Sequence, residues 1–219
     1  GLDKLQCNTN NITNLNLSGN PALTELGCWD NKIDSLDVSN NAYLGYLSCG
    51  GNNLTSLDLS SVNLISLRCQ NNKINTISLI NNFSLEELIC YSNNLENISL
   101  HDNHNISLLN IGNVSSQPSA FNNNFNSLDI SNNCNITVFY SKGLPNIECI
   151  QVCDTSVANN WNSQNIDPQH YFSINCNYTT INEKNNNNKR VISIKDIYGR
   201  ESSRNNNSLL FFLYQDGTV

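Results

Sequence analysis

Leu5-Gln6-Cys7-Asn8-Thr9-Asn10 is the first copy of a pattern that decides the fold of this chain. Its leucine, cysteine and asparagine return with a step of about 21 residues, which is one residue shorter between Cys49 and Cys69. A fixed period of this size indicates a solenoid of stacked coils. The cysteines of the row are Cys7, Cys28, Cys49, Cys69 and Cys90, and the asparagines are Asn10, Asn31, Asn52, Asn72 and Asn93.

A second, similar pattern begins half a period later in each repeat. Two apolar residues flank one polar residue, as in Leu57-Asp58-Leu59, and an asparagine follows in most repeats, as at Asn41 and Asn82. Short alternation is typical of a half-buried strand, and asparagine is typical of the turn that ends it. We therefore expect two extended sides per coil, joined by corners whose buried asparagines hydrogen-bond the backbone; losing one such partner should cost roughly 1–3 kcal/mol.

The spacing Leu-x-x-Leu-x-Cys-x-x-Asn-x-Ile/Leu resembles the leucine-rich repeat. The Leu-Asp-Leu-Ser segment at 57–60 is similar to the 21-residue class common in secreted bacterial proteins. The resemblance implies a mainly β, right-handed solenoid with parallel strands on two sides and little or no helix. We assign the solenoid to residues 1–152, with a loop insertion at about 112–124, where Val114 stands at the asparagine position.

Length and charge exclude several classes of function. The chain has 219 residues and a net charge of −7 without a basic patch, so a nucleic-acid partner is not expected. It contains no apolar run of 18 residues, so no membrane span is expected either. Methionine is absent and the repeat is already in register at Gly1, so we expect the chain to be part of a longer protein.

The five ladder cysteines are predicted to be core residues. Neighbouring parallel strands hold such side chains about 4.8 Å apart and pointing the same way, whereas a disulfide needs about 3.5–4.5 Å between Cβ atoms and a torsion near 90°. No histidine lies at zinc-ligand spacing from them. We interpret them as small buried hydrophobes rather than disulfide partners or metal ligands.

Residues 147–178 resemble the C-terminal cap of bacterial leucine-rich repeat arrays. The matching segments are Cys149-Ile150-Gln151-Val152, the tryptophan Trp161 and a Phe-Ser segment that leads to Cys176. The resemblance implies that Cys149 and Cys176 form a disulfide and that Trp161 covers the last coil. Cys134 and Cys153 could pair one coil apart, or they could be free thiols.

The C-terminal part of the chain changes character. Residues 179–189 are polar and without periodicity, which indicates a linker. Residues 190–219 contain two β-type runs and are predicted to form a small sheet. The segments 196–201 and 210–219 resemble the sorting domain of the Bacteroidota type IX secretion system, without its last strand. This resemblance implies a partner in the secretion machinery and a secreted or outer cell-surface location.

No constellation of residues predicts catalysis, a metal site or a cofactor. His101 and His104 flank Asp102 in one turn, where solvated side chains are a better interpretation than a metal clip. Three outward aspartates could attract Ca²⁺, but serines interrupt their row and no loop supplies six oxygens. That row contains Asp37, Asp58, Ser78, Ser99 and Asp129. We therefore do not expect an enzyme.

The outward residues of the first side are the candidate binding surface. Exposed Trp, Tyr and Arg dominate many protein interfaces, so the leading hypothesis is recognition of a protein partner at a cell surface. A carbohydrate- or surface-binding, lectin-like module is a second hypothesis, favoured if Trp29, Tyr46 and Tyr91 form a flat row. A structural spacer in a larger surface assembly is a third. The candidate residues are Glu25, Trp29, Tyr46, Arg68, Glu87 and Tyr91.

Overall fold

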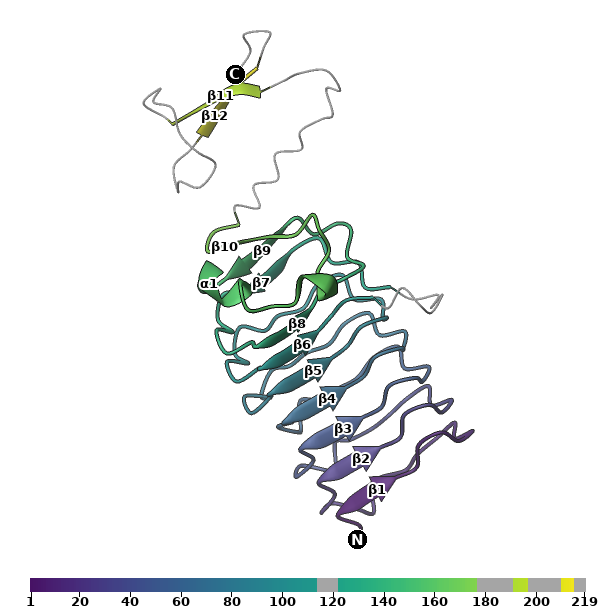
Figure 1. Cartoon of the computed structure of the whole chain (residues 1–219). Helices are drawn as coiled ribbons and strands as arrows, with labels where there is room; N and C mark the ends of the chain where they lie inside the picture. The colour runs from purple at the N-terminus through teal and green to yellow at the C-terminus, as the bar shows by residue number, and fades with distance from the viewer. Residues whose placement is uncertain (114–121, 177–190, 197–209, 215–219) are drawn as a thin grey trace. The chain divides into compact units, whose positions relative to one another are not determined.

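The computed structural model describes residues 1–113, 122–176, 191–196 and 210–214 (Figure 1). Each copy of the first pattern, the one that begins at Leu5, forms a three-residue parallel strand. Seven of these strands pair in register in the order β1-β2-β3-β4-β5-β6-β8, and this sheet is called the first sheet. Its strands are β1 (Lys4–Gln6), β2 (Glu25–Gly27), β3 (Tyr46–Ser48), β4 (Ser66–Arg68), β5 (Glu87–Ile89), β6 (Leu108–Asn110) and β8 (Val138–Tyr140).

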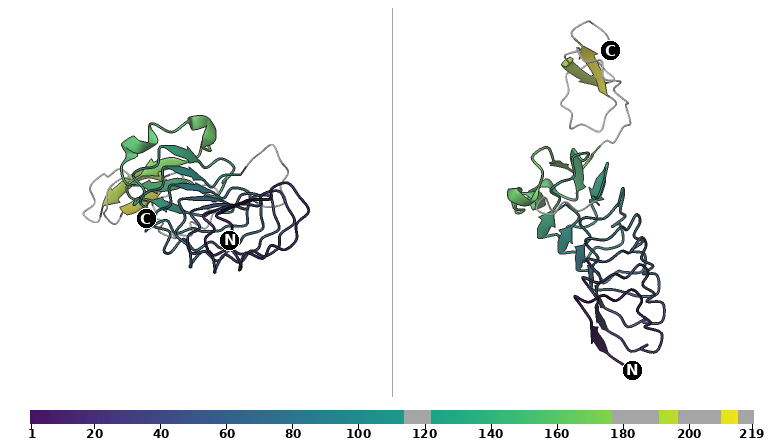
Figure 2. Two further views of the ribbon diagram at one scale, coloured as in Figure 1. Left: turned by 90° about the horizontal axis from the view of Figure 1, so that it is seen from below. Right: turned by 90° about the vertical axis from the view of Figure 1, so that its right-hand side faces the viewer.

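The inward residues of the first sheet form a continuous core. The central leucine of each strand faces the same leucine of the next, as Leu26 does with Leu47, and Phe139 continues this row in β8. The cysteines Cys28, Cys49, Cys69 and Cys90 are fully buried beside them. A single coil cannot bury such a row by itself, so its stability depends on stacking against its neighbours (Figure 2).

The opposite side of the coils is extended and forms fewer backbone pairs. Leu57 and Ile77 make an isolated parallel bridge. Toward the C-terminal end, β7 (Leu128–Ile130), β9 (Cys149–Val152) and β10 (Tyr171–Ser173) form a three-stranded parallel sheet in the order β10-β9-β7. The predicted fold class, a mainly β solenoid with parallel strands on two sides, is confirmed.

Asparagine side chains join each coil to its neighbour, as the sequence predicts. Asn72 donates through Nδ2 to the carbonyl oxygens of Cys49 (3.0 Å) and Cys69 (3.1 Å), and its Oδ1 accepts the Leu54 N–H (2.9 Å). Asn31, Asn52 and Asn93 repeat this arrangement. The corner is tight, because the residue before each of these asparagines has a positive φ, including the non-glycine Ser92 at 53°.

The insertion after β6 changes which residue serves as the ladder asparagine. By spacing, Val114 stands at the asparagine position of this coil, but Asn123 makes the ladder hydrogen bonds instead. Its Nδ2 donates to the carbonyl oxygens of Cys90 (2.9 Å) and Ile111 (2.9 Å), and its Oδ1 accepts the Leu95 N–H (3.1 Å). The chain thus resumes the repeat at the far end of the insertion. Residues 114–121 lie outside the described part.

The shortened repeat lacks one residue between Val62 and Leu64. Val62 is buried where neighbouring coils have an asparagine. In the second coil the Leu44 N–H bonds the Asn41 carbonyl within its own turn (2.8 Å). With one residue fewer, the Leu64 N–H instead donates to Oδ1 of Asn82 in the next coil (2.9 Å). The deletion is therefore absorbed at the corner without disturbing the core.

The cap seals the C-terminal end of the core with aromatic rings. Trp161 is 7% exposed, and its ring centroid lies 4.7 Å from Phe139 and 5.2 Å from Phe172. Its Nε1–H donates to the Ile136 carbonyl (3.0 Å). The predicted covering of the last coil by Trp161 is confirmed. The helical elements of the described chain are the single turns α1 (Thr155–Ala158) and η1 (Ser163–Asn165), both within the cap.

Disulfide bonds crosslink the C-terminal part of the solenoid. Cys134 and Cys153 are bonded, with Cα atoms 5.7 Å apart, which resolves the alternative left open by the sequence. Their bond joins the turn after β7 to the end of β9, and closing a loop of this size is worth about 3 kcal/mol in the chain-entropy model. Cys149 and Cys176 are both disulfide-bonded as well. The five ladder cysteines are free thiols.

Residues 175–219 form a separate unit from residues 1–174. Its described strands, β11 (Val191–Asp196) and β12 (Leu210–Tyr214), pair antiparallel. The small sheet predicted for this region is therefore present. The predicted linker at 179–189 lies outside the described residues. Across the four described ranges, no helix has the length and hydropathy required to cross a bilayer.

Candidate binding face

The outward side chains of β1 to β5 form two adjacent rows, which together are called the first-sheet face. Strand register fixes each row, because β-strands in register place equivalent residues side by side. The first row contains Lys4, Glu25, Tyr46, Ser66 and Glu87, and the second contains Gln6, Gly27, Ser48, Arg68 and Ile89. Each row contains both long and short side chains, so the face is not flat.

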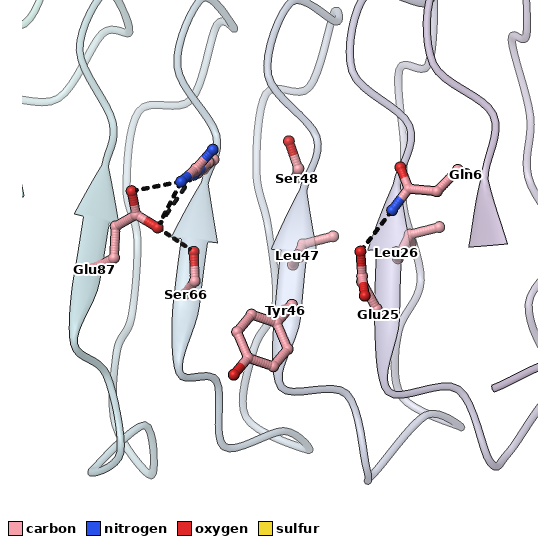
Figure 3. A pocket seen from close by; sticks show the side chains of 9 residues that line it. Gln6, Glu25, Leu26, Tyr46, Leu47, Ser48, Ser66 and Glu87 are labelled. Carbon is pink, nitrogen blue, oxygen red and sulfur yellow. Dashed lines mark hydrogen bonds and ion pairs between the residues drawn. The ribbon is translucent and has the colours of Figure 1, made fainter. Parts of the chain in front are cut away.

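A shallow groove lies across β3 on this face and is called the β3 groove (Figure 3). Its volume is about 240 Å³. Enclosed small-molecule sites usually have about 300–1,000 Å³, so the groove better suits a group that projects from a larger partner. The residues that line it are Gln6, Glu25, Leu26, Tyr46, Leu47, Ser48, Ser66, Arg68 and Glu87.

One wall of the groove is an ordered cluster around Glu87. Its Oε2 accepts hydrogen bonds from Ser66 Oγ (2.7 Å) and from Arg68 Nε (3.1 Å) and Nη2 (3.0 Å). Arg68 Nη2 also lies 2.9 Å from Glu87 Oε1. The arginine side chain is 51% exposed, so the pair adds little to stability, about 0–1 kcal/mol. Its effect is to hold the guanidinium in one orientation.

The opposite wall is a second ordered cluster around Glu25. Lys4 Nζ lies 3.0 Å from Glu25 Oε2, and Gln6 Nε2 donates to Glu25 Oε1 (2.8 Å). The hydrogen bond to Glu25 and the attraction of its carboxylate raise the pKa of Lys4. Both walls are therefore neutralised pairs, and between them β3 contributes Tyr46 and Ser48 (Figure 3).

The structure divides the six candidate residues into two groups. Glu25, Tyr46, Arg68 and Glu87 line the β3 groove, whereas Trp29 lies four residues beyond Glu25, the register partner of Tyr46. Trp29 is 40% exposed and Tyr46 is 48% exposed. The residue after Trp29 donates its backbone N–H to Gly50, which aligns Trp29 with Gly50. In the same way, the residue after Gln70 donates to Tyr91, which aligns Gln70 with Tyr91. The rings of Trp29, Tyr46 and Tyr91 therefore occupy two different rows.

Gln6, Ser48 and Ser66 were not among the sequence candidates. Gln6 reaches the groove because its side chain folds over Gly27, where a Cβ would overlap the Gln6 amide. The strand register could have predicted this placement of Gln6, because a glycine beside a long polar residue leaves space for the long side chain. Ser48 and Ser66 matter because they are short beside long neighbours, which becomes evident only when all the strands are aligned.

The second side carries no described metal site. Asp37 and Asp58 each accept the backbone N–H of the serine two residues later (2.9 Å), and hydrogen bonds from those serines lower the pKa of both carboxyls. His101 and His104 both contact Asn132 through Nδ1. Among the described residues, no group of three or more His, Cys, Asp or Glu side chains is placed to hold a metal ion.

A serine, a histidine and an aspartate form a hydrogen-bond network that holds the cap against the last coil. Ser141 Oγ lies 3.1 Å from His170 Nδ1, and His170 Nε2 lies 3.1 Å from the Leu144 carbonyl oxygen. Asp167 Oδ2 accepts the Leu144 N–H (2.7 Å). Ser141 is fully buried, so a substrate would not reach its hydroxyl. The network fixes residues 167–170 against the chain after β8.

The ladder thiols are chemically protected by their burial. Desolvation raises the pKa of Cys28 and of Cys90 to about 12, and it raises the pKa of Cys49 and Cys69 well above the ordinary value. Because the thiolate is the reactive form, these four side chains should not react with oxidants or disulfide reagents while the protein is folded. Cys7 is only half-buried.

We expect the native protein to release about one equivalent of thionitrobenzoate from dithionitrobenzoate, from Cys7, and about five after unfolding in urea. Absorbance at neutral pH measures both values. Cys7→Ala should remove the native signal and leave four equivalents in urea. Rapid reaction of several thiols in the folded Cys7→Ala protein would contradict the buried ladder.

The comparisons with known proteins identify the fold. No family model and no curated protein matches the chain. Among solved structures, it is similar to an internalin of Listeria monocytogenes, internalin F (TM-score 0.50, 21% identity, 72% of this chain and 45% of that chain). It is also similar to a leucine-rich repeat protein of Leptospira interrogans (TM-score 0.59, 17%, 78% and 43%).

A third similar structure is internalin C2 of Listeria monocytogenes (TM-score 0.51, 21% identity, 78% of this chain and 69% of that chain). Identities this low show the fold alone: the described solenoid has the architecture of leucine-rich repeat proteins. The chain spans less than half the length of internalin F and of the Leptospira protein.

Proposed function

We propose that this chain is a binding module that recognises a protein partner through the first-sheet face. The β3 groove carries the proposal, because one ordered cluster holds Arg68 in a fixed orientation, a second lies on the other wall, and the exposed Tyr46 lies between them. Preorganised side chains lose less conformational entropy on binding, and Arg, Tyr and Trp are the residue types that dominate interface energetics. The leucine-rich repeat architecture supports an interaction role.

A protein partner fits the surface better than a glycan. Stacking on sugar rings would be favoured by aromatic side chains in one row, whereas Tyr46 and Trp29 lie in different rows. The groove walls are ion pairs rather than ring faces. The lectin-like module and the structural spacer remain the alternatives that the experiment below distinguishes.

We propose that the module acts outside the cell, secreted or at the outer cell surface. Disulfides persist in oxidising compartments, and Cys134, Cys153, Cys149 and Cys176 are all bonded. The four buried ladder thiols stay reduced there because burial keeps them protonated. We further propose residues 1–152 as the repeat array, 147–178 as the cap and 190–219 as a sorting segment read by type IX secretion machinery.

Photo-crosslinking tests the proposed face. Benzoylphenylalanine is placed at Ser48 in the β3 groove or, as a matched control, at the exposed Ser78 on the second side, and each protein is incubated with whole cells of the source organism. We expect a discrete protein adduct from position 48 and none from position 78. A glycan adduct would support the lectin-like module, and adducts from neither position would support the spacer.

A double substitution gives the matching loss of function. Trp29→Ala with Arg68→Ala should reduce the adduct from position 48 at least about tenfold, because truncated interface anchors commonly cost more than 1 kcal/mol each. The thermal midpoint should change little, since both side chains are substantially exposed. An undiminished adduct would reject this face as the binding site.

A further inference from the structure

The β3 groove presents hydrogen-bond donors that no described residue uses. Arg68 engages Glu87 through Nε and Nη2, which leaves the two N–H groups of Nη1 unused. The hydroxyl groups of Ser48 and Tyr46, which also line the groove, donate to no side chain or carbonyl within the described ranges. The two hydroxyls can donate or accept, whereas the guanidinium of Arg68 can only donate, so Arg68 is the group that selects a partner with an acceptor oxygen.

The unit that carries the groove is acidic as a whole. Residues 1–174 contain 14 Asp and Glu but 5 Lys and Arg, and Arg68 is the single arginine among them. Lys4 and Arg68 are already paired within the groove walls. Exposed carboxylates such as Glu86, next to Glu87 on β5, have no cationic partner in the described residues. Such a field repels an acidic partner and attracts a basic one.

We propose that the partner is a protein segment of net positive charge that places one acceptor oxygen, from a carboxylate or a carbonyl, against Arg68 in the β3 groove. This inference rests on the proposed function and specifies the chemistry of its ligand. The acidic charge and the Arg68 contact act on different rate constants. The acidic surroundings steer a basic segment and raise the association rate, whereas the central Arg68 contact lowers the dissociation rate.

A random display library of 12-residue peptides tests this chemistry on the intact chain. Selection on the wild-type protein is followed by removal of peptides that also bind the Arg68→Ala protein. We expect the enriched peptides to carry net positive charge and to share one Asp, Glu, Asn or Gln at a fixed position. Their affinity should fall about tenfold or more with Arg68→Ala, and also with Arg68→Lys, which keeps the charge but loses the planar fork.

Two further measurements separate the steering by acidic residues from the anchoring by Arg68. Glu86→Gln should lower the association rate about twofold or more at low salt and leave the dissociation rate unchanged, because its carboxylate steers without touching the anchor. Replacing a shared Asp of a selected peptide by Asn, or a shared Glu by Gln, distinguishes a carboxylate from a carbonyl: retained affinity identifies a carbonyl-type acceptor, and a tenfold loss identifies a carboxylate.

Enrichment of neutral or acidic peptides, or no enrichment over the Arg68→Ala protein, would overturn this inference. Peptides without a shared acceptor that still lose binding with Trp29→Ala or Tyr46→Ala would do the same, while leaving the first-sheet face as the binding surface. The proposed function fails on different grounds, namely when the crosslinker at Ser48 captures no protein.

Discussion

Raising the pH from 8 to 10 should lower the free energy of unfolding of this protein by about 5 kcal/mol. The cause is the ladder of buried thiols. Their ordinary pKa is 9.0, and in the folded chain it is about 12 for Cys28 and Cys90 and well above 9.0 for Cys49 and Cys69. In the unfolded chain all four thiols lose their protons above about pH 9.

The sign follows from proton binding. Between the unfolded and the folded pKa, the folded state holds more protons than the unfolded state, so the stability falls as the pH rises through this window. The stability that the protonated thiols contribute is fully present below pH 9 and is lost above it. The loss over the whole interval from pH 8 to pH 10 is therefore about 1.4 kcal/mol per thiol. Four thiols give the expected total. Urea unfolding followed by circular dichroism at pH 8 and pH 10 measures it.

Matched substitutions assign the effect to the ladder. Cys69→Val removes one buried thiol, so the loss of stability between pH 8 and pH 10 should shrink by about 1.4 kcal/mol. Cys7→Ala should change the loss less, because this thiol is only half-buried at the edge of the first coil. An equal pH dependence in the wild-type and Cys69→Val proteins would show that the ladder is not its source.

Asn72→Ala should lower the free energy of unfolding by about 4 kcal/mol. Its side chain bonds three buried backbone groups, the carbonyls of Cys49 and Cys69 and the N–H of Leu54. Alanine leaves the Leu54 N–H without a partner, at a cost of roughly 1–3 kcal/mol. Each carbonyl keeps one asparagine donor, Asn52 for Cys49 and Asn93 for Cys69, and loses the other, at about 1 kcal/mol per bond. Asn72→Asp should be at least as harmful, since it retains the acceptor but loses both donors and buries a charge.

Two asparagines serve as controls for this prediction. Asn97 is exposed and its side chain bonds none of the described residues, so Asn97→Ala should change the stability by less than about 0.5 kcal/mol. Asn10 donates to carbonyls of its own coil only and is exposed, so its replacement should cost about 1 kcal/mol. Similar losses at Asn72 and Asn97 would mean that the ladder does not stabilise the coils.

Much of the solenoid can be predicted from the sequence because the same pattern recurs at a fixed period. Leucine, cysteine and asparagine in fixed spacing predict which side chains are inward, and the stacking of Leu26, Leu47 and Leu67 follows from register alone. The role of Asn123 was not predictable by spacing, since an insertion hides where the chain resumes the repeat. The Cys134–Cys153 disulfide was equally undecided, because sequence distance does not fix the separation of two corners.

The candidate site was predicted only in part. The sequence alone determined the coil, its buried ladder and the set of outward residues, because the two-residue alternation of a strand and the 21-residue step are local properties of the chain. Tertiary structure decided which outward residues meet: it brought Gln6 across Gly27 and paired Arg68 with Glu87, and it separated Trp29 from Tyr46. Side-chain length and contact between neighbouring coils set those outcomes, and both depend on residues about 20 positions apart in the chain.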